Sequence, residues 1–313
     1  MKTVTLTYPL TSMKDKVQVR PQVMAIGQFD GLHLGHASVI RRAIELGRSS
    51  GLPVAVLTFH PHPKDVMGKG DYEGYLTPLR DKEKILAEMG VDYLYVGEFT
   101  PEFSKVSPAD FVGNVLVPLE VDTAVVGFDF RFGYLGEGTA EAIGPLSGGA
   151  IKVETIAPFL LEGEKVGSSG IRAALKTGDA EKAGRWLGRP YRVKGTVVGG
   201  DKRGRTIGFP TANVDLSGHY VTPAKGVYAV RFGLGENVLG GVMNVGVKPT
   251  FTDGSVKPTF ETHLFDFDRS IYGEEVWMDF VRYIRPERKF SGIDELVEQI
   301  AKDADEARNI LKG

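Results

Sequence analysis

The sequence contains no cysteine. This absence excludes disulfide bonds, thiolate nucleophiles and zinc–thiolate clusters. The sequence also lacks any apolar run that approaches the length of roughly 20 residues needed to cross a bilayer. Charged residues at Lys14, Asp15, Lys16 and Arg20 interrupt the first 20 positions, so no signal-peptide core is present there. We therefore expect a cytoplasmic protein without a membrane segment.

A strong net charge is also lacking. The formal charge is −2 over 313 residues, with 25% charged and 42% hydrophobic residues, which is ordinary for globular proteins. Neither nucleic acid nor an anionic membrane is predicted as a partner. Any polyanionic substrate must therefore be held by local cationic sites. No solenoid repeat or low-complexity tract is present, and the length predicts two domains.

The first part of the chain alternates apolar runs with helical patterns. The runs suit buried parallel strands, and they are Val23–Ile26, Pro53–Phe59, Val91–Val96, Asp122–Gly127 and Ile151–Ala157. A helix is predicted over Lys82–Met89, and Ser107 is the predicted cap of another. Alternation of this kind predicts an α/β domain over residues 1–186, with a doubly wound parallel sheet and helices on both faces.

The pattern changes near Leu187–Pro190. Beyond it, apolar residues recur at every second position, as in Tyr228, Val230 and Phe232, in Phe260, Thr262 and Leu264, and in Val276, Met278 and Phe280. This alternation predicts an antiparallel β-barrel over residues 187–313. A closing helix is expected, with a capping box of Ser291 and Asp294. Its predicted buried stripe is Ile293, Leu296, Val297, Ile300 and Ala304.

One glycine-rich turn, Gly27–His36, joins the first predicted strand to a helix. Free N–H groups at a helix amino terminus form an anion site. His33 and His36 are three residues apart, so both can reach the same side of that site. We predict phosphate contacts at Gly27, Phe29, Asp30, Gly31 and Gly35. The pattern resembles the G-x-F-D-G-x-H-x-G-H signature of the nucleotidyltransferase superfamily, and it differs from both the P-loop and the dinucleotide fingerprint.

A second anion motif is predicted at Val166–Arg172. Ser168 and Ser169 open a helix whose first turn carries Arg172, so hydroxyls, N–H groups and a guanidinium can converge on phosphate oxygens. By itself this pattern fits an ordinary helix cap at Ser169 better than an anion site. Together with the histidine turn, it predicts one site for the α-phosphate of a nucleotide and one for the leaving phosphates.

Two loops of the first part are candidate substrate contacts. His60 and His62 follow the second predicted strand, and although two such histidines can indicate a metal, no carboxylate lies beside them in sequence. We instead expect a loop over the ligand crevice, with His62 touching substrate. Asp129 lies in the turn Gly127–Gly133, for which a tight strand-end turn with an aromatic plug is the alternative.

The segment Gly199–Asn213 is the dense motif of the second part. Gly199, Lys202, Gly204 and Arg205 suit a phosphate-binding loop, although a solvated hairpin loop is the alternative for such a run. Thr211 and Asn213 supply two neutral oxygen ligands. Mg²⁺ takes few protein ligands and fills its sphere with water and substrate phosphates, so the pair is chemically adequate.

With three further motifs the chain is similar, over nearly all its length, to the bacterial bifunctional riboflavin kinase/FAD synthetase family. These motifs are Gly208–Asn213, Asn244–Phe251 and Phe260–Leu264. The resemblance implies that ATP and riboflavin give FMN and ADP in the barrel, and that ATP and FMN give FAD and pyrophosphate in the first domain. It implies that Mg²⁺ takes part, and that Glu261 is the base for the kinase step. His33, His36 and Arg172 would stabilise charge on the α-phosphate.

We assign flavin contacts to His62, Asp129, Asn244 and Arg285, the role of Asp129 being on the flavin or the nucleotide side. Lid segments are expected at Lys202–Thr206 and Arg285–Phe290. Two positions depart from the family pattern: Gly167 stands where a serine is usual, which puts one phosphate contact in doubt, and His60 replaces a more polar or acidic residue. The predicted state is a monomer or a weak homo-oligomer.

Three alternatives compete with the bifunctional enzyme. One is a single-activity enzyme with a degenerate second domain. Another is a flavin-binding regulatory protein that senses FMN without turnover, against which the set of Thr211, Asn213 and Glu261 argues, since binding alone needs neither a metal pair nor a base. The third is an adenylyltransferase for another acceptor, which the motifs of the second part disfavour.

Overall fold

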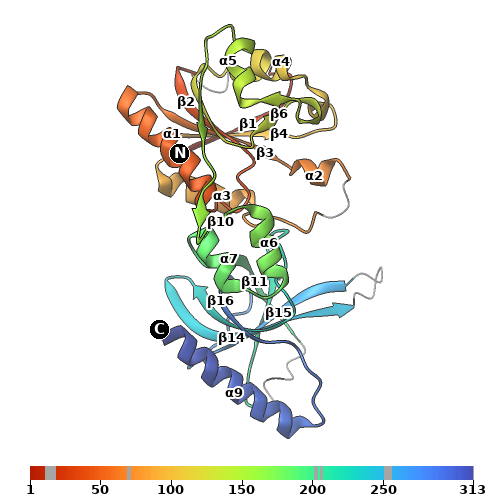
Figure 1. Ribbon diagram of the computed structural model, residues 1–313. Coiled ribbons are helices and arrows are strands. Elements are labelled where there is room, and N and C mark those ends of the chain that lie inside the picture. Colours follow the sequence, from red (N-terminus) through yellow and green to blue (C-terminus); the bar gives the residue numbers. More distant parts are fainter. Residues whose placement is uncertain (11–18, 69–71, 201–203, 205–206, 250–255, 313) are drawn as a thin grey trace. The chain divides into compact units, whose positions relative to one another are not determined.

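The computed structural model describes residues 1–10, 19–68, 72–200, 204, 207–249 and 256–312 (Figure 1). Its contacts divide the chain into two compact units. The first contains Met1–Tyr72 and Thr77–Val166, and the second contains Glu73–Leu76 and Gly167–Gly313. The short stretch Glu73–Leu76 thus groups with the second unit, although the first unit surrounds it in sequence.

A six-stranded sheet with all strands parallel forms the first unit, in the order β1-β4-β3-β2-β5-β8. The strands are β1 (Lys2–Leu6), β2 (Gln22–Ile26), β3 (Val54–His60), β4 (Tyr93–Glu98), β5 (Val121–Gly127) and β8 (Lys152–Ile156). The five predicted strands and the parallel sheet are therefore confirmed. The edge strand β1 was not predicted.

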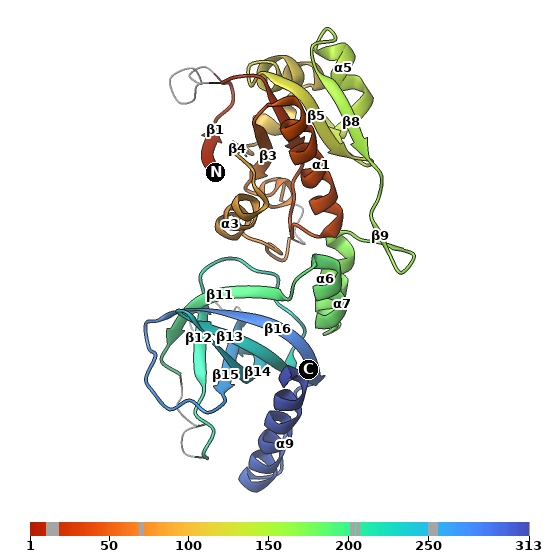
Figure 2. The same ribbon diagram turned by 90° about the vertical axis from the view of Figure 1, so that its left-hand side faces the viewer.

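Helices cover both faces of this sheet (Figures 1 and 2). On one face, α1 (Leu34–Ser50) and α3 (Leu79–Met89) bury Val39, Ile40, Ala43, Ile44 and Leu86 against the strands. On the other, α4 (Pro108–Phe111), η3 (Val112–Leu116) and α5 (Ile143–Leu146) bury Phe111, Val112, Val115, Leu116 and Ile143. This two-layered cover is the doubly wound arrangement that the alternating pattern predicts.

The predicted helix boundaries have visible local causes. Gly90, with φ of 92°, ends α3 because its left-handed conformation suits glycine. Ser107 caps α4 by accepting a hydrogen bond from the backbone N–H of Asp110. The helix from Ser107 continues as the π-helical turn η3.

Short elements complete the first unit. They are α2 (Pro63–Val66), η2 (Phe103–Lys105), η4 (Tyr134–Gly136) and η5 (Ala140–Ala142), with the two-stranded sheets of β6 (Arg131–Phe132) with β7 (Gly138–Thr139) and of β9 (Leu160–Leu161) with β10 (Glu164–Lys165).

A closed antiparallel barrel forms the centre of the second unit, in the order β11-β12-β15-β14-β13-β16. Its strands are β11 (Tyr191–Val198), β12 (Ala212–Leu216), β13 (Gly226–Leu234), β14 (Asn237–Pro249), β15 (Val256–Leu264) and β16 (Glu275–Arg285). The three predicted alternating faces are buried, each of their residues being at most 4% exposed. The barrel prediction is confirmed.

The closing helix is α9 (Ile293–Lys312), which lies against β13, β14 and β16 (Figure 2). Part of its predicted stripe is wrong. Ile293 is 67% exposed, and the buried residues are Asp303, Ala304 and Ala307, because the later turns of the helix meet the barrel. The predicted capping partner is also wrong: Ser291 donates its N–H and hydroxyl to Glu295, not to Asp294.

Two further helices, α6 (Ser168–Lys176) and α7 (Ala180–Leu187), belong to the second unit. They pack against each other, and α7 lies on β11 and β16. This packing groups them with the barrel, whereas a boundary after residue 186 remains a sequence prediction. Within the described part of the chain, no helix has both the length and the apolar character needed to span a membrane.

Candidate active sites

The glycine-rich turn follows the carboxyl end of β2, the sheet edge where ligands of parallel sheets bind. Its backbone is tightly folded, since Phe29, Gly31 and Leu32 all have positive φ, at 49°, 92° and 44°. The Phe29 ring packs on Gly27, where a Cβ would lie only 3.0 Å from it. Gly27 is thus needed for the close approach of the ring. The predicted residues of this turn therefore share one tightly folded loop.

His33 and His36 come together above the start of α1. His33 is the N-cap residue, and its Nδ1 accepts a hydrogen bond of 3.2 Å from the backbone N–H of His36. This bond places the proton of a neutral His33 on Nε2, because the other ring nitrogen is an acceptor. The two imidazole rings stack, and Phe29 meets His36 edge to face. The structure thus brings both predicted histidines together.

The electrostatics of His36 keep it uncharged. Burial, the neighbouring His33 and the charge of Lys82 lower the pKa of His36 well below its ordinary value. Its Nδ1 atom is buried and has no hydrogen-bond partner among the described residues. A neutral imidazole with an unused polar atom can contribute a hydrogen bond to a bound group.

Asp30 has a structural contact in addition to its predicted one. It is 4% exposed, and its Oδ1 accepts a hydrogen bond of 3.2 Å from the backbone N–H of Thr77. The contact joins the turn to the segment that leads into α3. From α3, Lys82 reaches the same turn and donates to the carbonyl oxygen of Gln28 at 2.7 Å.

The loop after β3 contains His60 and His62. Nδ1 of His62 accepts from the backbone N–H of Lys64 and caps α2, and its ring stacks on Tyr72 at 4.5 Å. Burial, followed by the charge of Lys82, lowers the pKa of His60. No group of three His, Cys, Asp or Glu side chains suited to a metal is found in the described ranges.

The loop after β5 presents Asp129 at the surface. Its carboxylate pairs with Lys165 of β10 at 3.0 Å, and the same lysine lies over the ring of Phe128, 4.2 Å from its centroid. Phe128 is 45% exposed. Asp129 thus borders an exposed aromatic ring, which is compatible with its predicted contact to a flavin or a nucleotide.

Ser168, Ser169 and Arg172 lie on α6, within the second unit. The N-cap residue of this helix is Gly167, and no side chain caps it. This is the structural consequence of the glycine that stands in place of the usual serine. The meeting of these residues with the histidine turn remains a prediction.

In the barrel, three predicted residues form one row across neighbouring strands. Glu261 of β15 is directly opposite Asn213 of β12 on one side and opposite Asn244 of β14 on the other. Opposite residues of antiparallel strands share a face. That face is the reverse of the one carrying the buried Thr262 and Met243. Sheet register therefore gathers Asn213, Glu261 and Asn244, although they are up to 48 positions apart in sequence.

The segment before β12 positions Thr211 two residues from Asn213. The carbonyl oxygen of Gly204 accepts from the backbone N–H groups of Ile207 and Phe209, and Nδ1 of His263 bonds the carbonyl oxygen of Pro210 at 2.9 Å. Gly200 lies so close to the Asn213 amide that a Cβ there would overlap it. Gly199 is exposed with open space around it. Lys202, Arg205 and most of the predicted lid Lys202–Thr206 lie outside the described residues, as do Thr250 and Phe251.

The donor set around Asn213 fits a small hard cation. Thr211 offers a hydroxyl oxygen, Asn213 an amide oxygen, and the adjacent Glu261 a carboxylate. Such oxygen donors are those that Mg²⁺ prefers, with phosphates and water completing its shell. The residues present therefore fit the predicted metal.

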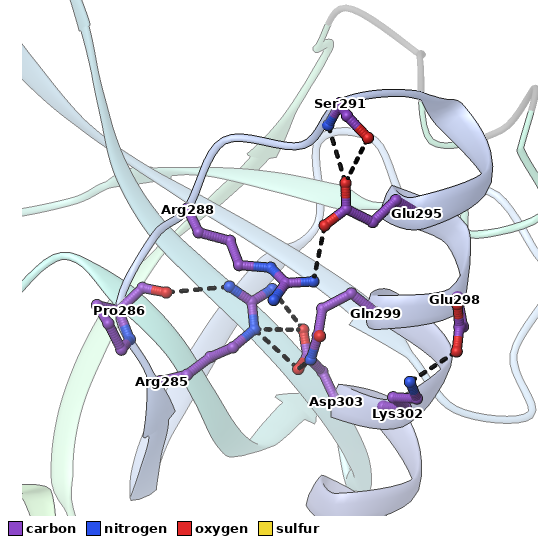
Figure 3. Close-up of polar contacts among 9 residues, drawn as sticks. All are labelled: Arg285, Pro286, Arg288, Ser291, Glu295, Glu298, Gln299, Lys302 and Asp303. Atoms are coloured by element: carbon purple, nitrogen blue, oxygen red, sulfur yellow. Dashed lines mark hydrogen bonds and ion pairs between the residues drawn. The ribbon is translucent and has the colours of Figure 1, made fainter.

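Arg285, at the end of β16, is held by α9 (Figure 3). Its guanidinium makes three hydrogen bonds of 2.6 to 3.0 Å to Asp303 and one to the carbonyl oxygen of Pro286. Gln299 also donates to Asp303. Glu287, in the loop that follows, accepts from Asn244 at 3.1 Å. Arg285 thus positions the loop beside the Asn213–Asn244 row, and its flavin contact remains a prediction.

Sequence reasoning missed Lys82 and Glu287. For Lys82 a signal exists, since it lies four residues before the fully buried Leu86 and so falls on the buried stripe of α3. For Glu287 the local sequence offers no comparable signal, because its contact to Asn244 spans 43 positions.

Comparison with known families matches both units. Residues 15–170 match the family model described as FAD synthetase, and residues 187–311 match the one described as riboflavin kinase. A protein of Bacillus subtilis, described as a bifunctional riboflavin kinase/FMN adenylyltransferase, is 43% identical over 309 residues, which cover 98% of this chain and 97% of that protein.

Other relatives carry the same description. One from Listeria monocytogenes is 42% identical and covers 98% of both chains, and one from Escherichia coli is 39% identical and covers 92% of both. Among solved structures, one described as a macrolide-efflux protein from Streptococcus pneumoniae superimposes with a TM-score of 0.89, at 32% identity and 99% coverage of each chain.

Proposed function

The chain belongs to the family of bifunctional riboflavin kinases/FMN adenylyltransferases, and we propose that its two reactions run at the barrel row and at the histidine turn. In the first reaction it transfers the γ-phosphoryl group of ATP to riboflavin, giving FMN and ADP. In the second it transfers the adenylyl group of ATP to FMN, giving FAD and pyrophosphate. Because the row and the turn belong to different compact units, a substitution at one should leave the other reaction intact.

The observation that carries the kinase assignment is the row of Asn213, Glu261 and Asn244. A ribityl hydroxyl is a poor nucleophile, so the transfer benefits from a base that takes its proton. Glu261 is the only carboxylate in that row and is its central residue. Its carboxylate accepts the hydroxyl proton while the hydroxyl oxygen bonds to the γ-phosphorus and the bond to the ADP oxygen breaks.

Thr211 and Asn213 would hold Mg²⁺ at this site. When bound, the ion neutralises charge on the ATP phosphates and orients them. The contacts of Gly200 to Asn213 and of His263 to Pro210 fix the two ligands in place. Gly199, Lys202, Gly204 and Arg205 would bind the phosphates from the same loop, as the sequence predicts.

The adenylyl step needs no base, because the FMN phosphate is already an anion. An oxygen of that phosphate bonds to the α-phosphorus of ATP, and pyrophosphate leaves with the electrons of the broken bond. Negative charge grows on the α-phosphate oxygens, and N–H groups of the stacked His33 and His36 would stabilise it. Arg172 would also stabilise this charge, and its motif with Ser168 and Ser169 would bind the leaving phosphates.

The flavin contacts stay with His62 and Asp129 in the first unit, and with Asn244 and Arg285 in the second. Among these, Asn244 is supported best, since it lies beside Glu261 in the barrel row. We propose a monomer or a weak homo-oligomer, which light scattering at several protein concentrations tests. A cytoplasmic location is also proposed.

A chromatographic time course with riboflavin, ATP and Mg²⁺ tests the assignment. For the unaltered protein, FMN should rise first and FAD should follow. Glu261→Gln should stop FMN formation while FMN supplied directly still becomes FAD. His36→Ala should let FMN accumulate without FAD. If either variant behaves like the unaltered protein, the corresponding residue assignment is wrong.

A further inference from the structure

We propose that Lys82 is a positioning residue of the adenylyltransferase site. It holds the Gly27–His36 turn in place by donating a hydrogen bond to the carbonyl oxygen of Gln28. The proposal rests on the assignment of adenylyl transfer to the Gly27–His36 turn. It concerns a lysine on α3, 46 or more positions along the chain from the turn that it supports.

Lys82 is a lysine in an environment that normally excludes lysine. It is 3% exposed, and buried lysines are rare unless they are paired. Its Nζ donates at 2.7 Å to the carbonyl oxygen of Gln28 and at 3.1 Å to Oγ1 of Thr58. The Thr58 hydroxyl donates in turn to the same Gln28 oxygen at 2.9 Å. Two donors thus converge on one backbone carbonyl of the turn.

The carbonyl group of Gln28 lies directly before the strained part of the turn. Gln28 immediately precedes Phe29, the first of the residues with positive φ. Such conformations cost free energy and persist only where surrounding contacts hold them. The charge-assisted bond from Lys82 is the strongest type available to a neutral carbonyl. Lys82 therefore holds the turn at the point where its conformation departs from ordinary backbone.

The ammonium group also contributes to the electrostatics of the turn. Asp30 of the turn attracts the ammonium group. The positive charge of Lys82 contributes to the lowered pKa values of His36 on α1 and His60 on β3. Burial lowers the pKa of Lys82 to about 8, against the opposing attraction of Asp30. Its charge in turn helps to lower the pKa of His36, so the lysine supports a neutral imidazole at the phosphate site.

A purely structural lysine would affect stability alone. A positioning lysine affects the adenylyl step through the turn and through His36, and it leaves the kinase step unchanged. The two reactions of the chain therefore supply an internal control, because the rate of FMN formation in the same sample reports the amount of folded barrel.

The decisive variant is Lys82→Met, which keeps the length of the side chain and removes its charge and donors. The matched control is Lys84→Met on the same helix, at an exposed position. Initial rates of FAD formation from supplied FMN are measured from pH 5.5 to 9, together with riboflavin phosphorylation. His36→Ala is assayed in parallel. Urea denaturation followed by circular dichroism checks that each variant is folded.

We expect Lys82→Met to lower kcat/KM for adenylyl transfer by about 10²-fold, the effect of a displaced binding group, with unchanged riboflavin phosphorylation. The loss of adenylyl transfer on the acid side of the pH profile should move to higher pH. The reason is that the pKa of His36 rises when the neighbouring positive charge is removed. The unaltered protein should lose activity as the pH rises through about 8 and Lys82 is deprotonated, and this loss should be absent from the variant. Lys84→Met should behave like the unaltered protein.

Three results separate the possible failures. If His36→Ala retains adenylyl transfer, the site assignment itself fails. If His36→Ala is inactive and a folded Lys82→Met has an unaltered rate and pH profile, the positioning role is overturned. If Lys82→Met does not fold, Thr58→Val is tested in its place. This variant retains Lys82 and removes the hydroxyl that bonds both its ammonium group and the Gln28 carbonyl oxygen. A lower adenylyl rate with an altered ATP KM supports the role, and an unchanged rate overturns it.

Discussion

His33 and His36 stack face to face, with their ring centroids 3.6 Å apart and 19° between the ring planes. Two positive charges at this distance would repel each other, so His33 disfavours the doubly protonated, charged form of His36. Burial and the charge of Lys82 act on His36 in the same direction. A phosphate bound at this turn, as proposed, would therefore meet neutral imidazole N–H donors rather than two positive charges.

Replacing either ring should affect one reaction only. We expect His36→Ala and His33→Ala each to lower kcat for adenylyl transfer by about 10² to 10³-fold, the range for a lost donor to developing negative charge. Riboflavin phosphorylation should be unchanged, since the barrel carries its own site. FAD and FMN formation are measured separately by chromatography. Equal loss of both reactions would point to unfolding and not to a catalytic role.

Stability of the first unit should fall with acid because of His36. In the unfolded chain His36 titrates near 6.5, whereas in the folded protein its pKa is well below that value. As the pH falls below 6.5 the unfolded state takes up a proton that the folded state does not, so the free energy of unfolding falls by up to about 1.4 kcal/mol per pH unit. The loss ends at the folded-state pKa.

Urea denaturation at pH 7.5 and 5.5 measures this dependence. His60, whose pKa is also lowered, contributes in the same direction. His36→Gln therefore serves as the control, and its unfolding free energy should depend less steeply on pH. An identical pH dependence in both proteins would show that His36 is not the residue responsible.

Glu261→Gln tests the proposed base of the kinase step. The amide has nearly the same shape and cannot take the ribityl proton, so we expect kcat for FMN formation to fall by about 10² to 10⁴-fold. Affinity for riboflavin, measured by quenching of its fluorescence, should change little. Asp215→Asn, on the exposed part of β12, is a suitable control because its carboxylate pairs with Lys257 at the surface. Normal turnover by Glu261→Gln would exclude the glutamate as base.

The pair of Arg285 and Asp303 should be a stability determinant of the barrel unit. Their side chains are 19% and 4% exposed and form a bidentate contact between β16 and α9 (Figure 3). Removing one partner of a buried pair leaves the other charge uncompensated, at a cost of about 3–5 kcal/mol. We expect Asp303→Asn to lose a value in that range in guanidinium denaturation. The surface pair of Lys302 and Glu298 is the control, and Lys302→Met should cost less than about 1 kcal/mol.

Two glycines on adjacent helices should respond to alanine with opposite signs. On α6, a Cβ at Gly170 would overlap the ring of Trp186, so Gly170→Ala should destabilise by about 1–3 kcal/mol through overpacking. On α7, the nearest atom to a Cβ at Gly184 is 3.6 Å away, so Gly184→Ala should stabilise by up to about 1 kcal/mol through helix propensity. Thermal unfolding of the two variants measures the difference, and a gain at both positions would disprove the contact at Gly170.

Apolar patterns in the sequence predicted most of the helices and strands, because those segments are deeply buried in the fold. The central strands of the first unit are buried on both faces and appear as continuous apolar runs. The edge strand β1 was missed because it exposes Lys2, Thr3 and Thr5 and so has no such run. In α9 the predicted stripe was wrong at Ile293, because the later turns, with Ala304, Ala307 and Leu311, are the ones that pack on the barrel.

The predicted site residues divide in the same way. His33 and His36 are only three residues apart, so the helix start and its N-cap bond bring them together. Asn213, Glu261 and Asn244 were recognised only through separate motifs, and the register of three strands makes them one row. The contact of Glu287 with Asn244 was not predicted, because no local periodicity relates residues 43 positions apart in sequence.

The sequence by itself determined the two kinds of architecture, the glycine-rich turn before a helix, and the residue types suited to phosphate chemistry, since each depends on neighbours within a few positions. Only the tertiary structure decided which distant groups surround them: Lys82 beneath the turn, Thr77 on Asp30, and Asp303 on Arg285. Hydrogen bonds and charges act over a few ångströms in space, whatever the distance along the chain, so their partners are determined by how helices and strands pack.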